Sequence, residues 1–186
     1  METRISQHPE SEPISIEDAQ QYLLLDADIA ADDTQIVESL ITAARQYCEH
    51  YCDRALVKQA YITTFDRFID GIYLPGGNVI NVLSFSYLNE MREKTEVDPA
   101  IYSVSAKGRL RLNPHDSWPR HEDIPNSIQI EYTTGYEQVP QDIIQAMRLL
   151  ITSFYENRSE VVVGASTGRI PFGVHALLSR HRIVGV

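Results

Sequence analysis

The stretch PQDIIQAMRLLITSFYENR, residues 140–158, decides the architecture of this chain. Its apolar side chains recur at spacings of three and four residues, which places them on one stripe of a helix: Ile143, Met147, Leu150, Ile151 and Phe154. Pro140 suits the first helical turn, where a missing N–H costs nothing, and Asp142 suits the positive end of the helix dipole. The preceding strand pattern stops at Gly135. We therefore predict a long helix near residues 140–158 that links a sheet to a C-terminal segment.

Two helical patterns come before the sheet. Ser15 opens the first, with Asp18 three residues later as a capping-box-like partner. Residues 26–31 are expected to be a break, after which Asp32 or Asp33 caps a second helix that runs to about Cys52. The spacing predicts one buried face on this second helix, made of Ile36, Leu40, Ala43, Tyr47 and Tyr51.

Between Ala55 and Tyr136 the period changes from helical to alternating. Apolar residues alternate with polar ones in two strand patterns, which are Ile128, Ile130 and Tyr132, and Leu83, Phe85 and Tyr87. Lys107-Gly108 is typical of the turn of a hairpin over residues 101–112, and residues 58–65 are a weaker strand candidate. No βαβ crossover pattern is present, so we predict an antiparallel sheet of about five or six strands.

The fold class is therefore α+β. A helical core, made of two N-terminal helices, the long helix and a short C-terminal helix, carries an inserted antiparallel β-sheet. Residues 1–13 are polar and poor in large apolar groups, which favours a disordered arm. Residues 14–158 form one domain with a β-rich insertion at about 56–136, and residues 159–186 form a flexible loop and a tail.

Composition narrows the class of protein. The chain has 186 residues, 43% of them hydrophobic, which is enough for one good core. No apolar run approaches the roughly 20 residues of a membrane helix, and the polar N-terminus lacks the apolar core of a signal peptide. Two cysteines argue against a disulfide scaffold and for a reducing compartment. A net charge of -10 argues against a broad nucleic-acid-binding face.

The charge is unevenly distributed along the chain. Residues 1–33 hold nine acidic residues against Arg4, whereas residues 157–186 hold four arginines against Glu160. Both ends can be solvated surface, or the basic tail can dock on an acidic partner.

The search for catalytic or metal-binding residues finds no matching motif. Cys48 and Cys52 share a helix face but lack two further zinc ligands, so two buried or half-buried thiols are expected. A loop between strands crowds together His115, Asp116, His121, Glu122 and Asp123. These could bind a divalent metal, but the loop is broken by proline, and Trp118-Pro119 is expected to anchor it to the sheet. We predict no enzyme, no cofactor and no metal.

In content and order, these segments resemble the head–tail connector proteins of tailed bacteriophages, the head-completion adaptors that sit beneath the portal. The strongest signature is YTTGYEQVPQDIIQA at residues 132–146 followed by YENR at residues 155–158. SIEDAQQYLLL at residues 15–25, IYLPGGNVINVLSFSYLN at residues 72–89 and RIPFGVHALLSRHRI at residues 169–183 occur in the family's order. The resemblance covers about residues 14–183.

The resemblance implies a structural protein of the virion neck, present in the bacterial host cytoplasm during assembly. Such proteins assemble as a ring under the portal, extend the DNA channel and form the platform for the next neck or tail component. The expected partners are the portal protein, further copies of the chain and the downstream neck or tail protein, with no membrane. DNA is expected to pass through the channel without sequence-specific binding.

Three candidate surfaces follow from combining this role with the residue pattern. A C-terminal tail that becomes ordered on the portal would dock through Ile170, Pro171, Phe172, Val174, Leu177, Leu178, Arg180 and Arg182. Val161, Val162 and Val163 form a candidate subunit interface, and acidic side chains expected to face the channel are Glu17, Asp18, Asp32 and Asp33. The alternatives left open are another phage neck protein, such as a stopper or tail-completion protein, and a metal-binding or enzymatic module around His115 and His121.

Overall fold

The structure is a computed structural model that describes residues 1–157 and 172–183. The fold is α+β, as the sequence predicts. The chain divides into two compact units. The β unit comprises residues 1–10 and 57–137, and the helical unit comprises residues 11–56 and 138–186. The division falls near the bounds of the β-rich insertion indicated by the sequence.

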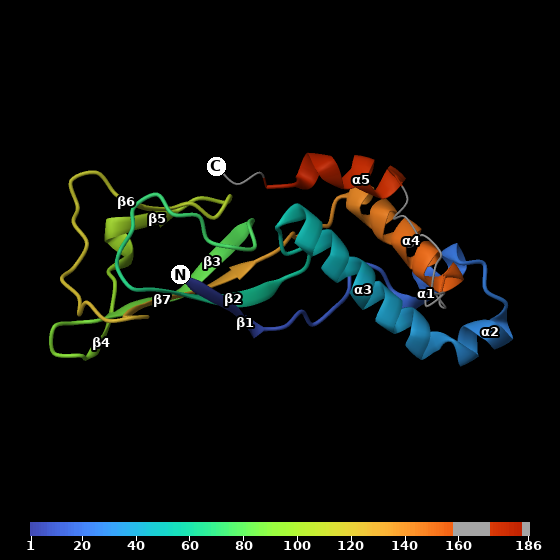
Figure 1. Cartoon of the computed structure of the whole chain (residues 1–186), viewed down its shortest axis with the longest axis horizontal. Coiled ribbons are helices and arrows are strands. Elements are labelled where there is room, and N and C mark those ends of the chain that lie inside the picture. Colours follow the sequence, from blue (N-terminus) through green and yellow to red (C-terminus); the bar gives the residue numbers. More distant parts are fainter. Residues whose placement is uncertain (158–171, 184–186) are drawn as a thin grey trace, which may run out of the picture. The chain divides into compact units, whose positions relative to one another are not determined.

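The β unit contains a five-stranded sheet in the order β1-β2-β7-β3-β4, with every neighbouring pair antiparallel (Figure 1). Its strands are β1 (Glu2–Gln7), β2 (Gln59–Phe65), β3 (Val79–Leu88), β4 (Lys94–Glu96) and β7 (Ile128–Thr134). A two-stranded sheet pairs β5 (Tyr102–Val104), which follows the short 3-10 helix η1 (Pro99–Ile101), with β6 (Leu110–Leu112). The predicted antiparallel sheet and the predicted hairpin over residues 101–112 are confirmed.

The central strand β7 forms the core of the β unit. Ile128, Ile130 and Tyr132 are fully buried, in the alternation that the sequence predicts. The Tyr132 hydroxyl lies 3.0 Å from Thr63 Oγ1 and 3.0 Å from the Pro75 carbonyl oxygen, to which it donates a hydrogen bond. Burial raises the pKa of this phenol, which keeps it a donor.

The chain turns away from the sheet directly after β7. Gly135 has a φ of +132°, and a Cβ atom built on it would meet the Val57 carbonyl oxygen at 2.6 Å. Only glycine allows the backbone to come this close to the start of the insertion.

Strand β3 departs from the predicted alternation. Two irregularities in its pairing with β7 leave Ile80 and Leu83 without partners, and both side chains are exposed. The prediction that Leu83 shares a face with Phe85 is therefore wrong, because a bulge shifts the side-chain order by one residue. Phe85 itself is buried, and Trp118 stacks on Phe68 with ring centroids 4.8 Å apart, which anchors the loop as expected.

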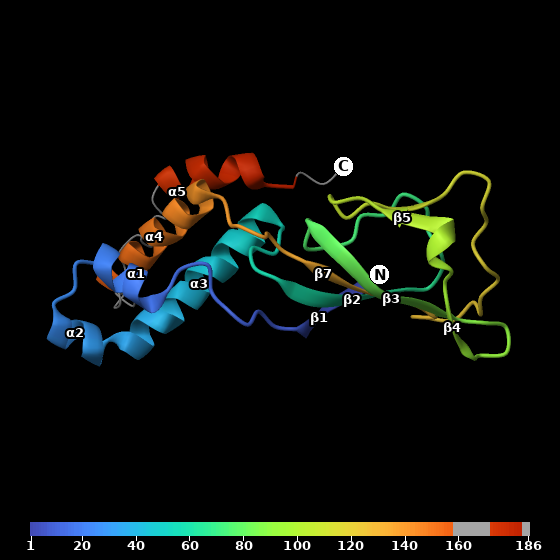
Figure 2. The same cartoon turned by 180° about the vertical axis from the view of Figure 1, so that it is seen from behind.

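The helical unit is seen from opposite sides in Figures 1 and 2, where α3, α4 and α5 lie alongside one another. Its helices are α1 (Ile16–Tyr22), α2 (Ala27–Asp32), α3 (Thr34–Cys52), α4 (Gln141–Glu156), α5 (Phe172–Leu178) and the 3-10 helix η2 (Ser179–His181). Ser15 caps α1 by accepting a 3.1 Å hydrogen bond from the Asp18 backbone N–H, as predicted. On α4 the predicted stripe is buried, apart from a half-buried Phe154.

The predicted face of α3 is wrong by one residue. The buried side chains are Val37, Ile41, Ala44, Arg45, Cys48 and Cys52, whereas Ile36 and Ala43 are exposed. Two adjacent stripes of this helix are both apolar, so spacing alone does not select between them. The true stripe also contains a charged residue that a hydrophobic pattern excludes.

Two further segments differ from expectation. Residues 26–31 are not a break, because Ala27–Asp32 form helix α2. Residues 1–13 include the strand β1, which pairs with β2, where the sequence indicates a disordered arm. A polar edge strand is stabilised by its partner strand rather than by its own composition.

Candidate interaction surface

The C-terminal helix α5 is already folded against α4 in the single chain. Val174 and Leu178 on its inner side are fully buried, whereas Phe172 at its first position is 88% exposed. A helix of this length is marginal alone, so its packing against α4 stabilises it.

Three contacts fix η2 and the two residues after it to neighbouring elements of the helical unit. His181 Nε2 lies 3.1 Å from Asp142 Oδ2 in the first turn of α4, and this hydrogen bond lowers the pKa of the Asp142 carboxyl. The Ile183 backbone N–H donates to the Cys52 carbonyl oxygen at 2.9 Å. The Arg182 guanidinium lies over the Tyr51 ring, 5.7 Å from its centroid.

The predicted docking residues therefore fall into three groups. Val174 and Leu178 belong to the core of the helical unit. Phe172, Arg180 and Arg182 are exposed and Leu177 is half-buried, so these four contribute to a surface that is both apolar and basic. Ile170 and Pro171, together with the proposed interface residues Val161, Val162 and Val163, lie outside the described residues.

The predicted acidic residues lie on α1 and at the junction of α2 and α3. Glu17, Asp18 and Asp32 are exposed. Asp33 is half-buried and accepts a hydrogen bond from the Tyr155 hydroxyl of α4. Asp33 thus has a structural contact that the other three carboxylates do not show.

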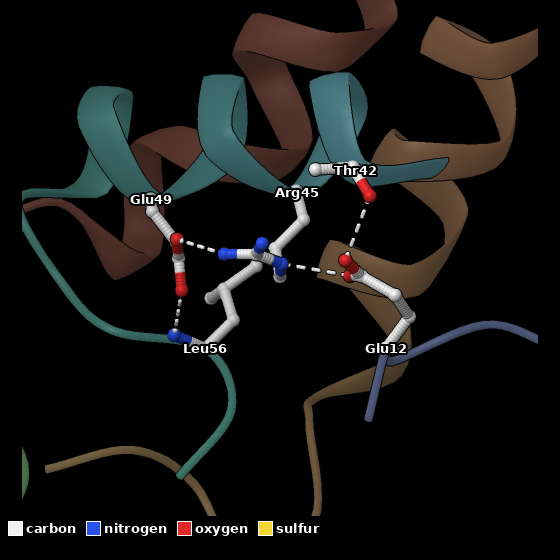
Figure 3. A network of polar contacts seen from close by, with 5 residues as sticks. All are labelled: Glu12, Thr42, Arg45, Glu49 and Leu56. Atoms are coloured by element: carbon white, nitrogen blue, oxygen red, sulfur yellow. Dashed lines mark hydrogen bonds and ion pairs between the residues drawn. The ribbon is translucent and has the colours of Figure 1, made fainter. Parts of the chain in front are cut away.

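An ion network around the buried Arg45, which the sequence pattern misses, links three segments of the helical unit (Figure 3). Arg45 Nε donates to Glu12 Oε2 at 2.7 Å, and Arg45 Nη1 donates to Glu49 Oε2 at 2.7 Å. Thr42 Oγ1 donates to the other oxygen of Glu12, and the Leu56 backbone N–H donates to the other oxygen of Glu49, both at 2.9 Å. The network ties the segment before α1 and the segment after α3 to the middle of α3.

The electrostatics of this network follow from burial and pairing. Burial opposes the charged form of Arg45, but hydrogen bonds and the charges of Glu12 and Glu49 outweigh it and raise the pKa of the guanidinium. Burial raises the pKa of Glu49 against the lowering effect of its two hydrogen-bond donors. The signal for this network in the sequence is the Arg45–Glu49 spacing of four residues inside an otherwise apolar stripe.

The cysteines and the loop histidines considered for chemistry belong to different units of the chain. Cys48 and Cys52 are buried free thiols, as expected, and burial raises their pKa values to about 12 and about 11. His115 is exposed, while His121 lies edge-on to the Phe68 ring with centroids 5.2 Å apart. Within residues 1–157 and 172–183, no three His, Cys, Asp or Glu side chains are grouped as metal ligands would be. No helix in the same ranges has the length and apolar character needed to cross a membrane.

Comparison with known proteins identifies relatives over the whole chain. The sequence model of the head completion protein (HCP) family matches residues 12–184. A chain from the virion of a native gene transfer agent (GTA) particle is 25% identical, with a TM-score of 0.77. Chains from the neck of an empty GTA particle, computed with C6 symmetry, and the neck of a native GTA particle, computed with C12 symmetry, are 24% and 23% identical, with TM-scores of 0.77 and 0.71. In all three cases the match covers 100% of this chain and 97% of the other. No curated protein matches the chain.

Proposed function

The chain belongs to the head completion protein family, and from this premise we propose that it is a structural head–tail connector at the neck of a phage-like particle. The observation that carries the proposal is the family match over residues 12–184. The similarity of the whole chain to a chain of the gene transfer agent virion supports it. The proposed role is structural, and it assigns no catalytic step to the chain.

The proposed assembly is a ring beneath the portal that extends the DNA channel and forms the platform for the next neck or tail component. The cyclic symmetries named for the two neck structures support this proposal. In a ring of identical copies each subunit meets its neighbours through two unlike surfaces. Electron microscopy of the chain mixed with its cognate portal tests the proposal. We expect a closed ring on one end of the portal, and a portal that stays bare at saturating concentrations of the chain would overturn it.

The surface proposed for the portal is the exposed side of α5 and η2. Phe172, Leu177, Arg180 and Arg182 supply an aromatic and aliphatic contact with two cations, and Ile170 and Pro171 directly precede them in the sequence. The sequence predicts a tail that becomes ordered only on the portal. Because α5 is already packed on α4 in the single chain, we propose instead that it binds the portal as a preformed helix. A preformed helix avoids the entropy cost of ordering upon binding.

The acidic side chains of Glu17, Asp18, Asp32 and Asp33 are proposed to face the DNA channel. Carboxylates repel phosphates, so a wall of them favours passage of DNA over binding. Val161, Val162 and Val163 are proposed to contact a neighbouring subunit. A ring structure with these carboxylates on its outer wall would contradict the first of these assignments.

A further inference from the structure

Leu24 occupies a backbone position that is normally filled by glycine. It directly follows the C-cap of α1 and has a φ of +55°. The Leu24 and Leu25 backbone N–H groups donate to the carbonyl oxygens of Gln21 and Gln20, each at 3.2 Å. This is the hydrogen-bond pattern of a Schellman cap, whose left-handed residue is usually Gly or Asn because a larger side chain is strained there.

Burial within the chain does not compensate for this strain. The Leu24 side chain is 88% exposed. Three more large apolar side chains within residues 22–36 are also exposed, namely Tyr22, Ile29 and Ile36. We call residues 22–36 the α1–α3 corner. Exposed apolar groups that gather in one short region of a folded chain are typical of a protein contact surface.

Carboxylates accompany the apolar groups of the corner. Asp26 and Asp28 are exposed in the same fifteen residues, and residues 11–44 contain no Lys, Arg or His. One cation from outside this segment lies close by, where Arg148 of α4 lies over the Tyr22 ring at 5.6 Å from its centroid. The corner therefore combines exposed apolar side chains with exposed carboxylates, which suits a partner surface that is apolar and basic.

We propose that the α1–α3 corner is the contact surface for a second copy of this chain, with Leu24 as its anchor. The inference rests on the proposed ring. Two corners facing each other would bring like charges together, so the contact is between unlike surfaces. Since all 16 Lys and Arg residues lie outside residues 11–44, the basic counter-surface is a different part of the second copy. A contact of this kind generates a ring when its rotation closes.

The hairpin of β5 and β6 has the chemistry that the corner requires. Tyr73 is exposed beside it, and the Arg109 guanidinium lies over the Tyr73 ring, 5.6 Å from its centroid. Lys107 and Arg111 are exposed on the same hairpin. The surface of α5 and η2 also joins an aromatic ring to arginines, but it is assigned to the portal above.

The decisive variant is Leu24→Gly, because strain and contact predict opposite effects of this substitution. Glycine accepts the left-handed backbone, so the unfolding temperature of the variant should equal or exceed that of the natural chain. Loss of the anchor should raise the concentration needed to complete the ring on the portal by about tenfold or more. Met91→Gly, which removes another exposed side chain, is the matched control and should leave ring completion unchanged. Leu24→Asn should behave like the glycine variant, since Asn also tolerates this backbone.

Mass photometry of portal complexes reads out the number of bound copies. A Leu24→Gly chain that fills the ring at the natural concentration overturns the inference and leaves the connector role intact. A lower unfolding temperature for this variant also overturns it, because Leu24 would then stabilise the fold itself.

A natural chain that never binds the portal overturns the connector role instead. In that case chemical crosslinking of the concentrated free chain decides the inference. Fewer crosslinks between copies for Leu24→Gly support it, and equal numbers overturn it.

Discussion

Arg45 and Glu12 form an ion pair of 2.7 Å that joins the segment before α1 to the middle of α3. Arg45 makes a second ion pair with Glu49, and both carboxylates use their remaining oxygens for other donors. Pairing of two guanidinium nitrogens with carboxylates offsets part of the cost of burying the Arg45 charge.

Replacing Arg45 with methionine should lower the free energy of unfolding by about 2–4 kcal/mol. The substitution keeps an apolar stem but leaves the largely buried Glu49 carboxylate without its cation, and solvent compensates only part of the loss at Glu12. Urea unfolding measures the change. The control is Arg92→Met, which removes the ion pair between the exposed Arg92 and Glu122 and should cost about 0–1 kcal/mol. Equal losses from the two substitutions would contradict this account.

The packing of α5 and η2 against α4 should weaken in acid, because it depends on the Asp142 carboxylate. The His181 contact lowers the pKa of the Asp142 carboxyl below its ordinary value. A carboxyl with a lowered pKa in the folded state stabilises that state above its ordinary pKa, about 3.9 for aspartate, and this contribution is lost as the pH falls through the lowered value. The protection factors of the α5 amides, which compare the intrinsic exchange rate at each pH with the observed rate, should therefore fall over that acid range. In Asp142→Asn the protection factors should already be lower at neutral pH and depend less on acid.

The two cysteines should be unreactive in the folded chain. Burial raises the pKa of the Cys48 thiol to about 12 and that of the Cys52 thiol to about 11, so at neutral pH almost no thiolate is present. We expect a thiol reagent to label neither residue in buffer and both in denaturant. Stoichiometric labelling of the folded chain within minutes would show that α3 opens at this face.

Substitutions on the exposed side of α5 should affect portal binding, and substitutions on its buried side should affect the stability of the fold. The double variant Phe172→Ser with Arg180→Glu changes exposed side chains, so it should weaken portal binding with little change in unfolding temperature. Leu178→Ala on the buried side should instead lower the free energy of unfolding by about 2–5 kcal/mol. Portal pull-down and thermal unfolding of both variants check the prediction. Portal binding that the double variant leaves unchanged would remove α5 as the docking helix.

Regular amphipathic patterns were sufficient to predict much of the fold. The α4 stripe and the alternation along β7 each have one apolar face, so a single period describes them. On α3, two neighbouring stripes are apolar, and the buried one is selected by packing and by the pairing of Arg45. Spacing carries no information about that choice.

Features that depend on distant partners were not visible in local sequence. The bulge that exposes Leu83 arises from the pairing of β3 with β7, and β1 forms an edge of the sheet only because β2 lies beside it. In the same way, the docking set predicted from residues 170–182 mixed both sides of α5, because the position of α4 decides that Val174 is buried and Phe172 is not. The acidic character of the α1–α3 corner can be read from its composition. The left-handed backbone at Leu24 cannot, because a leucine does not indicate that conformation.

The tight approach of Gly135 to Val57 has an evolutionary and practical consequence. The two ends of the β-rich segment lie close together, at Val57 and Gly135. A segment whose ends are this close can replace another without a change in the distance that the flanking chain must bridge. Exchange of this segment between related genes would therefore leave the helices undisturbed at the joints. Such a chimera must also receive a matching strand β1. This strand pairs with β2 but precedes helices α1–α3 in the sequence, so it lies outside the exchanged segment.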